Sequence, residues 1–401
     1  MELMNEQIHL PVAPNLKLNK YLLCCVGQWP YQTPLEKILV GSVFLPIAGF
    51  QVMFQTWGMI ASLIFDDFNA FVEDFSPGLI SYMCFMKYFN FFNRQSIKTL
   101  LDTMQEDWKL YTKSKEEYDI MCKHYALGKR VTFLYTVSIF GTMGPYMFVQ
   151  PIVNVFKKFG LVNGTIVREL MFRYDYFMNV EKYYYPLLLH TMTGTVTFIL
   201  MVVACDSMIV LFIRHECGLC EILGSRLRNI VESDNMDIEL NPDKHDDKAY
   251  QTVKSCAILH KHILHFGNTI EEMNTMSSFL QIGFNMIGMS FTQFQAIANL
   301  DDPNMAVRFI PFSMCLYCIL LLSSLPGQQL SDCTGSIFVN TLENKWYQSS
   351  IQARKILHII LLKSMQPMRL TAGKLYILDL QNFTAVLKAS FSYCMVLCSF
   401  K

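Results

Sequence analysis

The chain has 401 residues, of which 52% are apolar and only 16% are charged. About a quarter of the residues of a soluble domain are usually charged, so this composition indicates a membrane protein and argues against a soluble two-domain enzyme. The 33 basic residues balance the 33 acidic ones, so the net charge gives no reason to expect a nucleic-acid partner.

Apolar runs long enough to cross a bilayer follow one another along the chain. A helix needs about 20 mostly apolar residues to cross roughly 30 Å of hydrocarbon. The charge-free runs are Ile38 to Phe65, Val131 to Phe156, Tyr183 to Cys205, Met273 to Leu300 and Phe309 to Ser331. Two further runs, Phe75 to Asn93 and Leu380 to Phe400, contain one lysine each, Lys87 and Lys388. The sequence therefore predicts an all-α membrane protein with seven transmembrane helices.

The distribution of basic residues predicts the orientation of these helices. Lys and Arg gather on the cytoplasmic side of membrane proteins. The segments on the N-terminal side of the membrane carry 24 basic residues, and those on the opposite side carry seven. We therefore expect the N-terminus inside and the C-terminus outside. The sequon Asn163-Gly164-Thr165 then lies outside, which makes Asn163 a candidate glycosylation site.

Amphipathic segments suggest that the helices extend beyond the membrane into a packed cytoplasmic anchor. Residues 95–128, 209–227 and 346–362 show apolar residues at helical spacing among charged ones. The expected division of the chain is as follows: a cytoplasmic segment at 1–37, four transmembrane helices at 38–213, cytoplasmic helices and a loop at 214–272, two transmembrane helices at 273–331, a cytoplasmic anchor helix at 332–374, and the last helix with a short external tail at 375–401.

The cysteines do not indicate disulfides or a metal site. None of the 13 cysteines lies in a predicted outside loop, so we expect free thiols. Cys217-x-x-Cys220 and Cys315-x-x-Cys318 lack a second pair with ligand spacing, which favours packing over metal binding.

The histidine cluster from His260 to His265 has no carboxylate or cysteine ligand nearby in sequence, which favours solvated helix surface over a metal or pH-sensing site. No catalytic motif is visible, and we expect neither enzymatic activity nor a cofactor.

The last predicted helix carries one stripe of small residues that ends in bulky apolar ones. At 100° per residue, its five members lie within about 60° of one another. They are Ala385, Ala389, Ser392, Val396 and Phe400. Such a stripe suits a pore helix with an apolar constriction, and it suits equally a helix packed against neighbours through small residues. Lys388 either lines an inner vestibule or extends to the cytoplasmic interface, and Lys87 has the same ambiguity.

The C-terminal hundred residues resemble the insect odorant receptor family. The resemblance lies in Leu370-Thr371-Ala372-Gly373-Lys374, Phe383, Ser390-Phe391-Ser392-Tyr393 and Met395-Val396-Leu397 before Lys401. Gly27-Gln28-Trp29-Pro30 is also typical of the family, though weaker alone. The length of the chain, its seven predicted spans and its predicted orientation extend the resemblance over essentially the whole sequence.

This resemblance implies an odorant-gated, non-selective cation channel of the plasma membrane of olfactory sensory neurons. In that family, odour-binding subunits form a heterotetramer with a common co-receptor. The co-receptor has a large insertion between the fourth and fifth spans, which this chain lacks, so the chain resembles an odour-binding subunit. The last helices line the pore, and its constriction would fall on Val396 and Phe400, beyond Ser392 and Lys388. Phe400 is bulkier than the co-receptor's residue, which weakens its assignment to the gate.

The resemblance also implies a ligand pocket in the outer half of the bundle, among the second, third, fourth and sixth spans and near the fifth. The predicted topology maps that region onto a set of candidates. They are Leu79, Tyr82, Met83, Met86, Met143, Tyr146, Met147, Gln150, Leu188 and Met192, with Phe309 to Phe312 and Cys315. Such side chains suit a small neutral volatile, although ordinary helix packing would account for many of them. We expect Tyr146→Ala to shift ligand potency.

Three alternatives from other classes fit less well. A G-protein-coupled receptor also has seven spans, but it would need an external N-terminus and usually an outer disulfide. A membrane enzyme or transporter would need a catalytic constellation or paired charges within the membrane, which the sequence does not reveal. A gustatory receptor would carry a different C-terminal signature.

Overall fold

The computed structural model of the chain describes residues 17–91, 94–159, 161, 170, 172, 176–230, 240, 242–299 and 303–399. Almost all of these residues are helical. The helices are α1 (Lys17–Cys25), α2 (Pro34–Ile64), α3 (Phe68–Phe91), α4 (Arg94–Tyr111), α5 (Lys115–Lys158), α6 (Tyr184–Arg228), α7 (Lys248–Ala298), α8 (Pro303–Glu343), the short 3₁₀ helix η1 (Trp346–Gln348), α9 (Ile351–Ser364) and α10 (Leu380–Ser399). A small antiparallel hairpin of β1 (Thr371–Ala372) and β2 (Tyr376–Ile377) precedes α10.

Side-chain caps fix the starts of several helices. Thr33 accepts a hydrogen bond from the backbone of Glu36 while the Glu36 side chain accepts one from the backbone of Thr33, which forms a capping box at α2. Ser114 and Glu117 do the same at α5. Asp247 caps α7 from the end of the preceding polar loop. These caps satisfy the first backbone N–H groups of helices whose interiors are set by apolar side chains.

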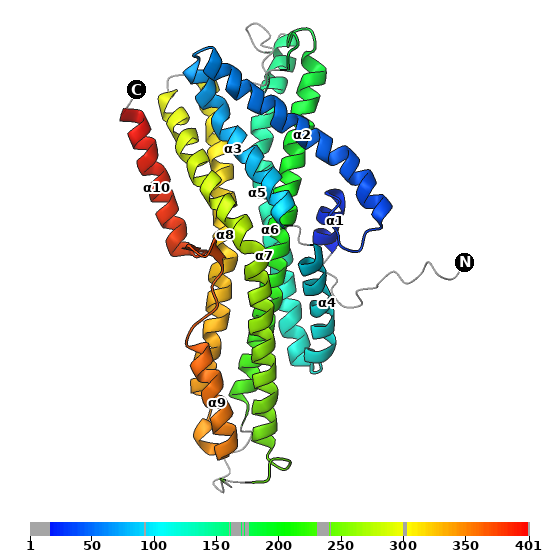
Figure 1. Ribbon diagram of the computed structural model, residues 1–401, viewed down its shortest axis with the longest axis vertical. Coiled ribbons are helices and arrows are strands. Elements are labelled where there is room, and N and C mark those ends of the chain that lie inside the picture. The colour runs from blue at the N-terminus through cyan, green and yellow to red at the C-terminus, as the bar shows by residue number, and fades with distance from the viewer. Residues whose placement is uncertain are drawn as a thin grey trace, which may run out of the picture.

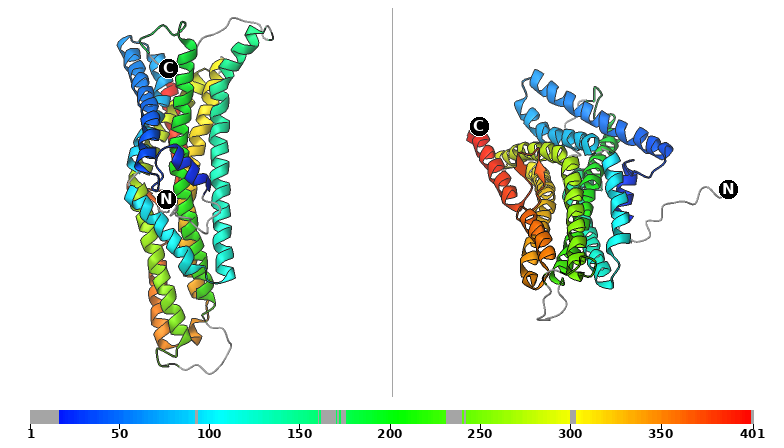
Figure 2. Two further views of the ribbon diagram at one scale, coloured as in Figure 1. Left: turned by 90° about the vertical axis from the view of Figure 1, so that its right-hand side faces the viewer. Right: turned by 60° about the horizontal axis from the view of Figure 1, so that its bottom comes forward.

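The long helices α6, α7 and α8 run side by side along the molecule (Figure 1). We call the end formed by α9 with residues 214–228 of α6 and 248–272 of α7 the base, and the opposite end the top. Helices α2 and α3 cover one side of the upper half, α5 packs along α6 and α8, and α10 contacts α7 and α8 at one edge (Figure 2). Helix α6 is buried along most of its length, so it forms the axis of the core.

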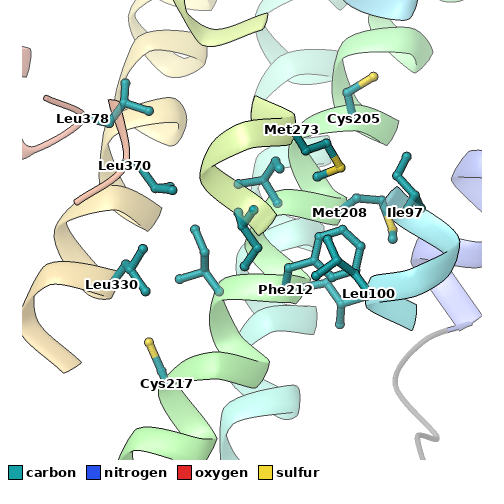
Figure 3. Packing of buried hydrophobic residues seen from close by; sticks show 14 of the residues in the cluster. Ile97, Leu100, Cys205, Met208, Phe212, Cys217, Met273, Leu330, Leu370 and Leu378 are labelled. Carbon is teal, nitrogen blue, oxygen red and sulfur yellow. The ribbon is translucent and has the colours of Figure 1, made fainter. Parts of the chain in front are cut away.

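A dry apolar core joins the upper half to the base. In Figure 3, Met208 and Phe212 of α6 lie near Met273 of α7, while Leu330 of α8 lies on the side of the hairpin. Each of these four residues is at most 8% exposed. Close packing of this kind transmits displacements, because a shift of one element must be accommodated by its neighbours.

Apart from one or two residues at their ends, the described parts of the seven predicted apolar runs each lie in one helix: α2, α3, α5, α6, α7, α8 and α10. Within the described residues, three helices are long and apolar enough by composition to cross a membrane, at Pro34–Ile64, Tyr184–Arg228 and Phe309–Glu343. The extension of the fourth run toward the base is confirmed, because α6 continues without a break to Arg228. The second run differs, since α3 ends at Phe91 and a separate helix, α4, begins at Arg94.

The histidines of the base correct one prediction. His262 is not solvated surface, because its Nε2 atom lies 2.8 Å from Oδ1 of the buried Asp107 on α4. His215 on α6 binds the other carboxylate oxygen of Asp107, also at 2.8 Å. His260 is buried as well, whereas His265 of the same cluster is exposed. The sequence could not reveal this because Asp107 reaches the cluster from a different helix.

The 13 cysteines are all free thiols, as predicted. Cys217 and Cys220 are buried on α6, and the Cys217 thiol contacts Cys333 on α8. These side chains pack between helices.

Candidate functional site

The upper half contains an apolar cavity lined by residues of five helices and by Phe172. Its lining consists of Gln51 from α2; Pro77, Ile80, Ser81 and Cys84 from α3; Ile139 and Met143 from α5; Phe172; Thr195, Phe198, Ile199 and Val202 from α6; and Phe312, Cys315, Leu316 and Ile319 from α8. The cavity volume is about 60 Å³, against the roughly 10–15 Å³ that one water molecule needs on the same measure. The cavity therefore has room for a compact organic molecule, and its walls favour an apolar one.

The hydroxyl groups of the cavity wall are committed to their own helices. Ser81 donates to the carbonyl oxygen of Pro77 at 3.0 Å, and Thr195 donates to that of Thr191 at 2.8 Å. Both oxygens keep lone pairs that can accept a further hydrogen bond. Among the residues that the structure describes, the lining carries no Asp, Glu, Lys, Arg or His, so it offers shape and dispersion contacts together with a few neutral polar groups.

Gln51 enters the cavity wall because its neighbour on α6 is a glycine. A Cβ atom added to Gly194 would lie 1.3 Å from Oε1 of Gln51, far inside any allowed contact distance. Gln51 is 1% exposed and lines the cavity, so its side chain is enclosed within the bundle. Gly194 thus leaves the space that the end of the Gln51 side chain occupies between α2 and α6.

The residues predicted for a ligand pocket separate into distinct environments. Met143, Phe312 and Cys315 line the cavity. Met147 and Met192 do not line the cavity and belong to a smaller apolar cluster with Tyr176 and Phe172, of which Phe172 also borders the cavity. The remaining described candidates, which do not line the cavity, are Leu79, Tyr82, Met83, Met86, Leu188, Phe309, Ile310 and Pro311.

Two of these candidates face elsewhere for clear reasons. The Tyr82 hydroxyl is hydrogen-bonded to Thr56 on α2, and Met83 is packed in the main core at 1% exposure. The side chains of Tyr146 and Gln150, and the whole of Asn163 and Phe400, lie outside the part of the chain that the structure describes. The roles of all these residues stay predictions.

A buried ionic network lies beside the cavity on the side of the base. Lys87 on α3 donates to Asp206 on α6 and, at 2.6 Å, to Oε1 of Gln281 on α7. Tyr135 on α5 donates to the second oxygen of Asp206 at 2.7 Å. The network thus joins four helices through side chains that are almost fully buried.

This network overturns two expectations. Lys87 neither lines a vestibule nor extends to the interface, because it is 3% exposed and paired with Asp206. A paired charge constellation does exist in the apolar bundle, although none was expected. The available signal was Lys87 itself: a cation within an apolar span usually has a partner, and Asp206 stands just beyond the end of the fourth charge-free run.

The hairpin that precedes α10 is hydrogen-bonded to α7. Glu271 accepts a hydrogen bond from the backbone N–H of Thr371 at 2.8 Å and another from its hydroxyl. The N–H of Gly373 donates to the carbonyl oxygen of Thr275 at 2.9 Å. Gly373 has φ +63°, and a Cβ there would lie 2.8 Å from the ring of Phe279. Glycine therefore allows both the turn and its close approach to α7.

Helix α10 turns its stripe of small residues away from its own chain. Its buried residues are Val386, Ser390 and Cys394. Of the stripe, Ala385, Ser392 and Val396 are exposed, with Val396 at 51%, as is the neighbouring Lys388, whereas Ala389 is half-buried. Within this chain, therefore, α10 packs mainly through Val386, Ser390 and Cys394 rather than through its small-residue stripe.

Comparison with known proteins identifies relatives of this chain. A family model described as 7tm Odorant receptor matches residues 67–391. Odorant receptor 13a of Drosophila melanogaster is 21% identical over 315 residues, which are 75% of this chain and 73% of that protein.

Two solved structures share the fold. The olfactory receptor OR5 of Machilis hrabei in complex with eugenol superimposes with a TM-score of 0.80 at 12% identity, covering 98% of this chain and 99% of that one. Another structure of OR5 gives a TM-score of 0.75 at 11% identity, covering 96% and 98%. At sequence identities this low, the structural similarity establishes the fold alone.

Proposed function

The chain belongs to the 7tm odorant receptor family, whose model matches residues 67–391, and from this membership we propose that it is the odour-binding subunit of an odorant-gated cation channel. Membership itself makes the chain a multi-pass membrane receptor of olfaction rather than an enzyme. The proposal adds the gating ligand, the ion pathway and the co-receptor with which the chain forms a heterotetramer.

Seven helices cross the plasma membrane in this proposal: α2, α3, α5, α6, α7, α8 and α10. The N-terminus lies in the cytoplasm, and the base is a cytoplasmic anchor. The excess of Lys and Arg on the N-terminal side supports this orientation. The similarity of the fold to OR5 supports the arrangement of the helices.

The cavity between α3, α5, α6 and α8 is the odorant site, and this cavity is the observation that carries the proposal. Its uncharged walls suit a small, neutral, volatile molecule. These are the four spans in which the family resemblance locates a pocket. The related OR5, which shares the fold, was solved in complex with eugenol.

Helix α10 lines the pore with its exposed stripe, and Val396 with Phe400 forms an apolar constriction. The orientation of the helix supports this role, because the small residues point away from the chain's own bundle and toward the space that other subunits would enclose. An apolar ring can close such a pathway by excluding water. Lys388 lies nearer the base on the exposed side.

Whole-cell current recorded during exposure to a panel of volatiles tests the function. The chain is expressed with and without an insect co-receptor, and odour-evoked cation current should require this chain. Met143→Ala should change the order of potencies within the panel, because Met143 lines the cavity. Met147→Ala is the matched control, since Met147 is equally buried one turn further along α5 but is not among the residues that line the cavity.

Both substitutions remove a buried methionine, so their general destabilising effects should be similar, at about 2–5 kcal/mol each before relaxation. Surface biotinylation corrects the currents for the amount of receptor present. An equal change of potency order in both variants would remove the cavity from the proposal. Silence of the wild-type chain despite surface expression with the co-receptor would contradict the channel function.

A further inference from the structure

The ionic network and the cavity are linked through three shared helices. On each of α3, α5 and α6, one residue that lines the cavity is followed, about one helical turn closer to the base, by one residue of the network. The three pairs are Cys84 and Lys87, Ile139 and Tyr135, and Val202 and Asp206. One turn corresponds to about 5.4 Å. The network is therefore the polar layer immediately beneath the cavity.

The fourth member of the network lies on a helix that does not touch the cavity. Within the described residues, α7 contributes nothing to the cavity lining, yet Gln281 of α7 accepts a hydrogen bond from Lys87. Six residues toward the base, about 9 Å along the helix axis, Thr275 binds the backbone N–H of Gly373. One turn further, Glu271 binds Thr371. The hairpin formed by these residues leads directly into α10.

We propose that the network of Lys87, Asp206, Tyr135 and Gln281 couples occupancy of the cavity to the position of α10, with α7 as the connecting rigid element. This inference rests on the proposed function. A ligand that spreads α3, α5 and α6 changes the geometry at Lys87 and Asp206. The Lys87 ammonium then moves relative to Gln281 and displaces α7, and the hairpin moves with α7.

Two physical features make the network suitable for this role. A buried ion pair tolerates little loss of geometry, because its attraction must offset the cost of removing both charges from water. When the helices move, the ion pair is therefore expected to change from one discrete hydrogen-bonding arrangement to another, and the two charges do not separate gradually. Coupling between distant sites requires such an element with distinct states that both sites influence.

A coupling residue and a pocket residue have different signatures in receptor responses. Changing the equilibrium between closed and open states shifts the apparent affinity for every ligand by the same factor and also changes the current without ligand. Changing a contact with the ligand alters the order of potencies. These signatures separate the network from the cavity wall, and they also separate it from a merely structural role, which would alter only the amount of receptor at the surface.

The test uses Tyr135→Phe and Gln281→Met, which remove single hydrogen bonds from the network and leave Lys87 and Asp206 in place. Tyr125→Phe is the matched control on α5, because the buried Tyr125 hydroxyl is bonded to His215 in the base. Gln293→Met is the matched control on α7, because Gln293 donates to Tyr317 at 2.6 Å, away from the network.

Concentration–response curves for at least three volatiles of different shape, and the current without odour, are recorded for each variant with the co-receptor. We expect both network variants to shift all half-maximal concentrations by a common factor of about threefold or more and to change the odour-independent current. The controls should stay within about twofold. Network variants that match the controls, or that reorder the ligands, would overturn the inference. Absence of wild-type current would instead contradict the proposed function, so the two failures are distinguishable.

Discussion

The ammonium group of Lys87 lies against the carboxylate of Asp206, 119 residues away in sequence, and the two side chains are 4% and 9% exposed. Removing one partner leaves a buried charge without compensation, whereas removing both does not.

We therefore expect Lys87→Met alone to destabilise the protein strongly, by roughly 3–5 kcal/mol, and the double variant Lys87→Met/Asp206→Leu to recover most of the loss. The thermal unfolding midpoint of detergent-solubilised protein, followed by size-exclusion fluorescence, measures both. A double variant no more stable than Lys87→Met would show that the charges do not depend on each other.

Gly373 should tolerate no side chain. Alanine there must adopt φ near +63° and press against the Phe279 ring, and a left-handed backbone conformation alone costs about 1–3 kcal/mol in a non-glycine residue. Gly373→Ala should lower the unfolding midpoint, while Gly335→Ala on α8, whose added Cβ would meet only Pro367 at 3.7 Å, should not. Equal midpoints for the two variants would argue against the strain.

The base should contribute a pH-dependent part of the stability. The hydrogen bond that His262 donates to Asp107, together with the negative charges of Asp107 and Glu106, raises the pKa of His262. A raised pKa in the folded state means that the stabilisation is complete below the unfolded value of about 6.5 and is lost as pH rises through the folded value.

His262→Gln should therefore lower the unfolding free energy by about 1 kcal/mol at pH 6 and by less at pH 8.5. His265→Gln, at an exposed position on the same helix, is the control and should show no such trend. A larger effect of His262→Gln at high pH than at low pH would reverse the assignment. Unfolding midpoints across this pH range provide the measurement.

The proposed orientation predicts a glycan at Asn163. Treatment with a peptide N-glycosidase should increase the electrophoretic mobility of the wild-type chain and leave that of Asn163→Gln unchanged. Asn382→Gln serves as the comparison, because Asn382 lies at the start of α10 with its side chain bonded to the carbonyl oxygen of Ile377. Modification at Asn382 but not at Asn163 would contradict the orientation.

Substitution in the exposed stripe of α10 should alter ion passage. Val396→Ala should change relative cation permeability or single-channel conductance, because Val396 lies on the stripe. Phe391→Ala is the control. Phe391 is 54% exposed and Val396 is 51% exposed, but Phe391 lies about 140° away around the helix at 100° per residue. Phe391→Ala should therefore change neither the cation permeability nor the conductance. Reversal potentials in substituted cation solutions provide the measurement.

The local properties of the sequence predicted the helices well. They predicted little about how the helices pack against one another. Each apolar run lies in a helix because hydropathy is a property of neighbouring residues. The rotation of a helix about its axis depends on its partners, so Met143 and Met147, one turn apart, enter different environments. The pairing of Lys87 with Asp206 depends on the packing of α3 against α6, which no local pattern encodes.

The contact between Gln51 and Gly194 constrains how the cavity can change during evolution. Because the end of the Gln51 side chain occupies the space of a Cβ at position 194, a larger residue there must either displace that side chain or be accompanied by a shorter one at position 51. Among receptors of this family these two positions should therefore covary, a bulky 194 with a small 51. Such paired changes would alter the polarity and reach of one wall of the cavity from a position outside it, and ligand preference could diverge while the remaining walls stay unchanged.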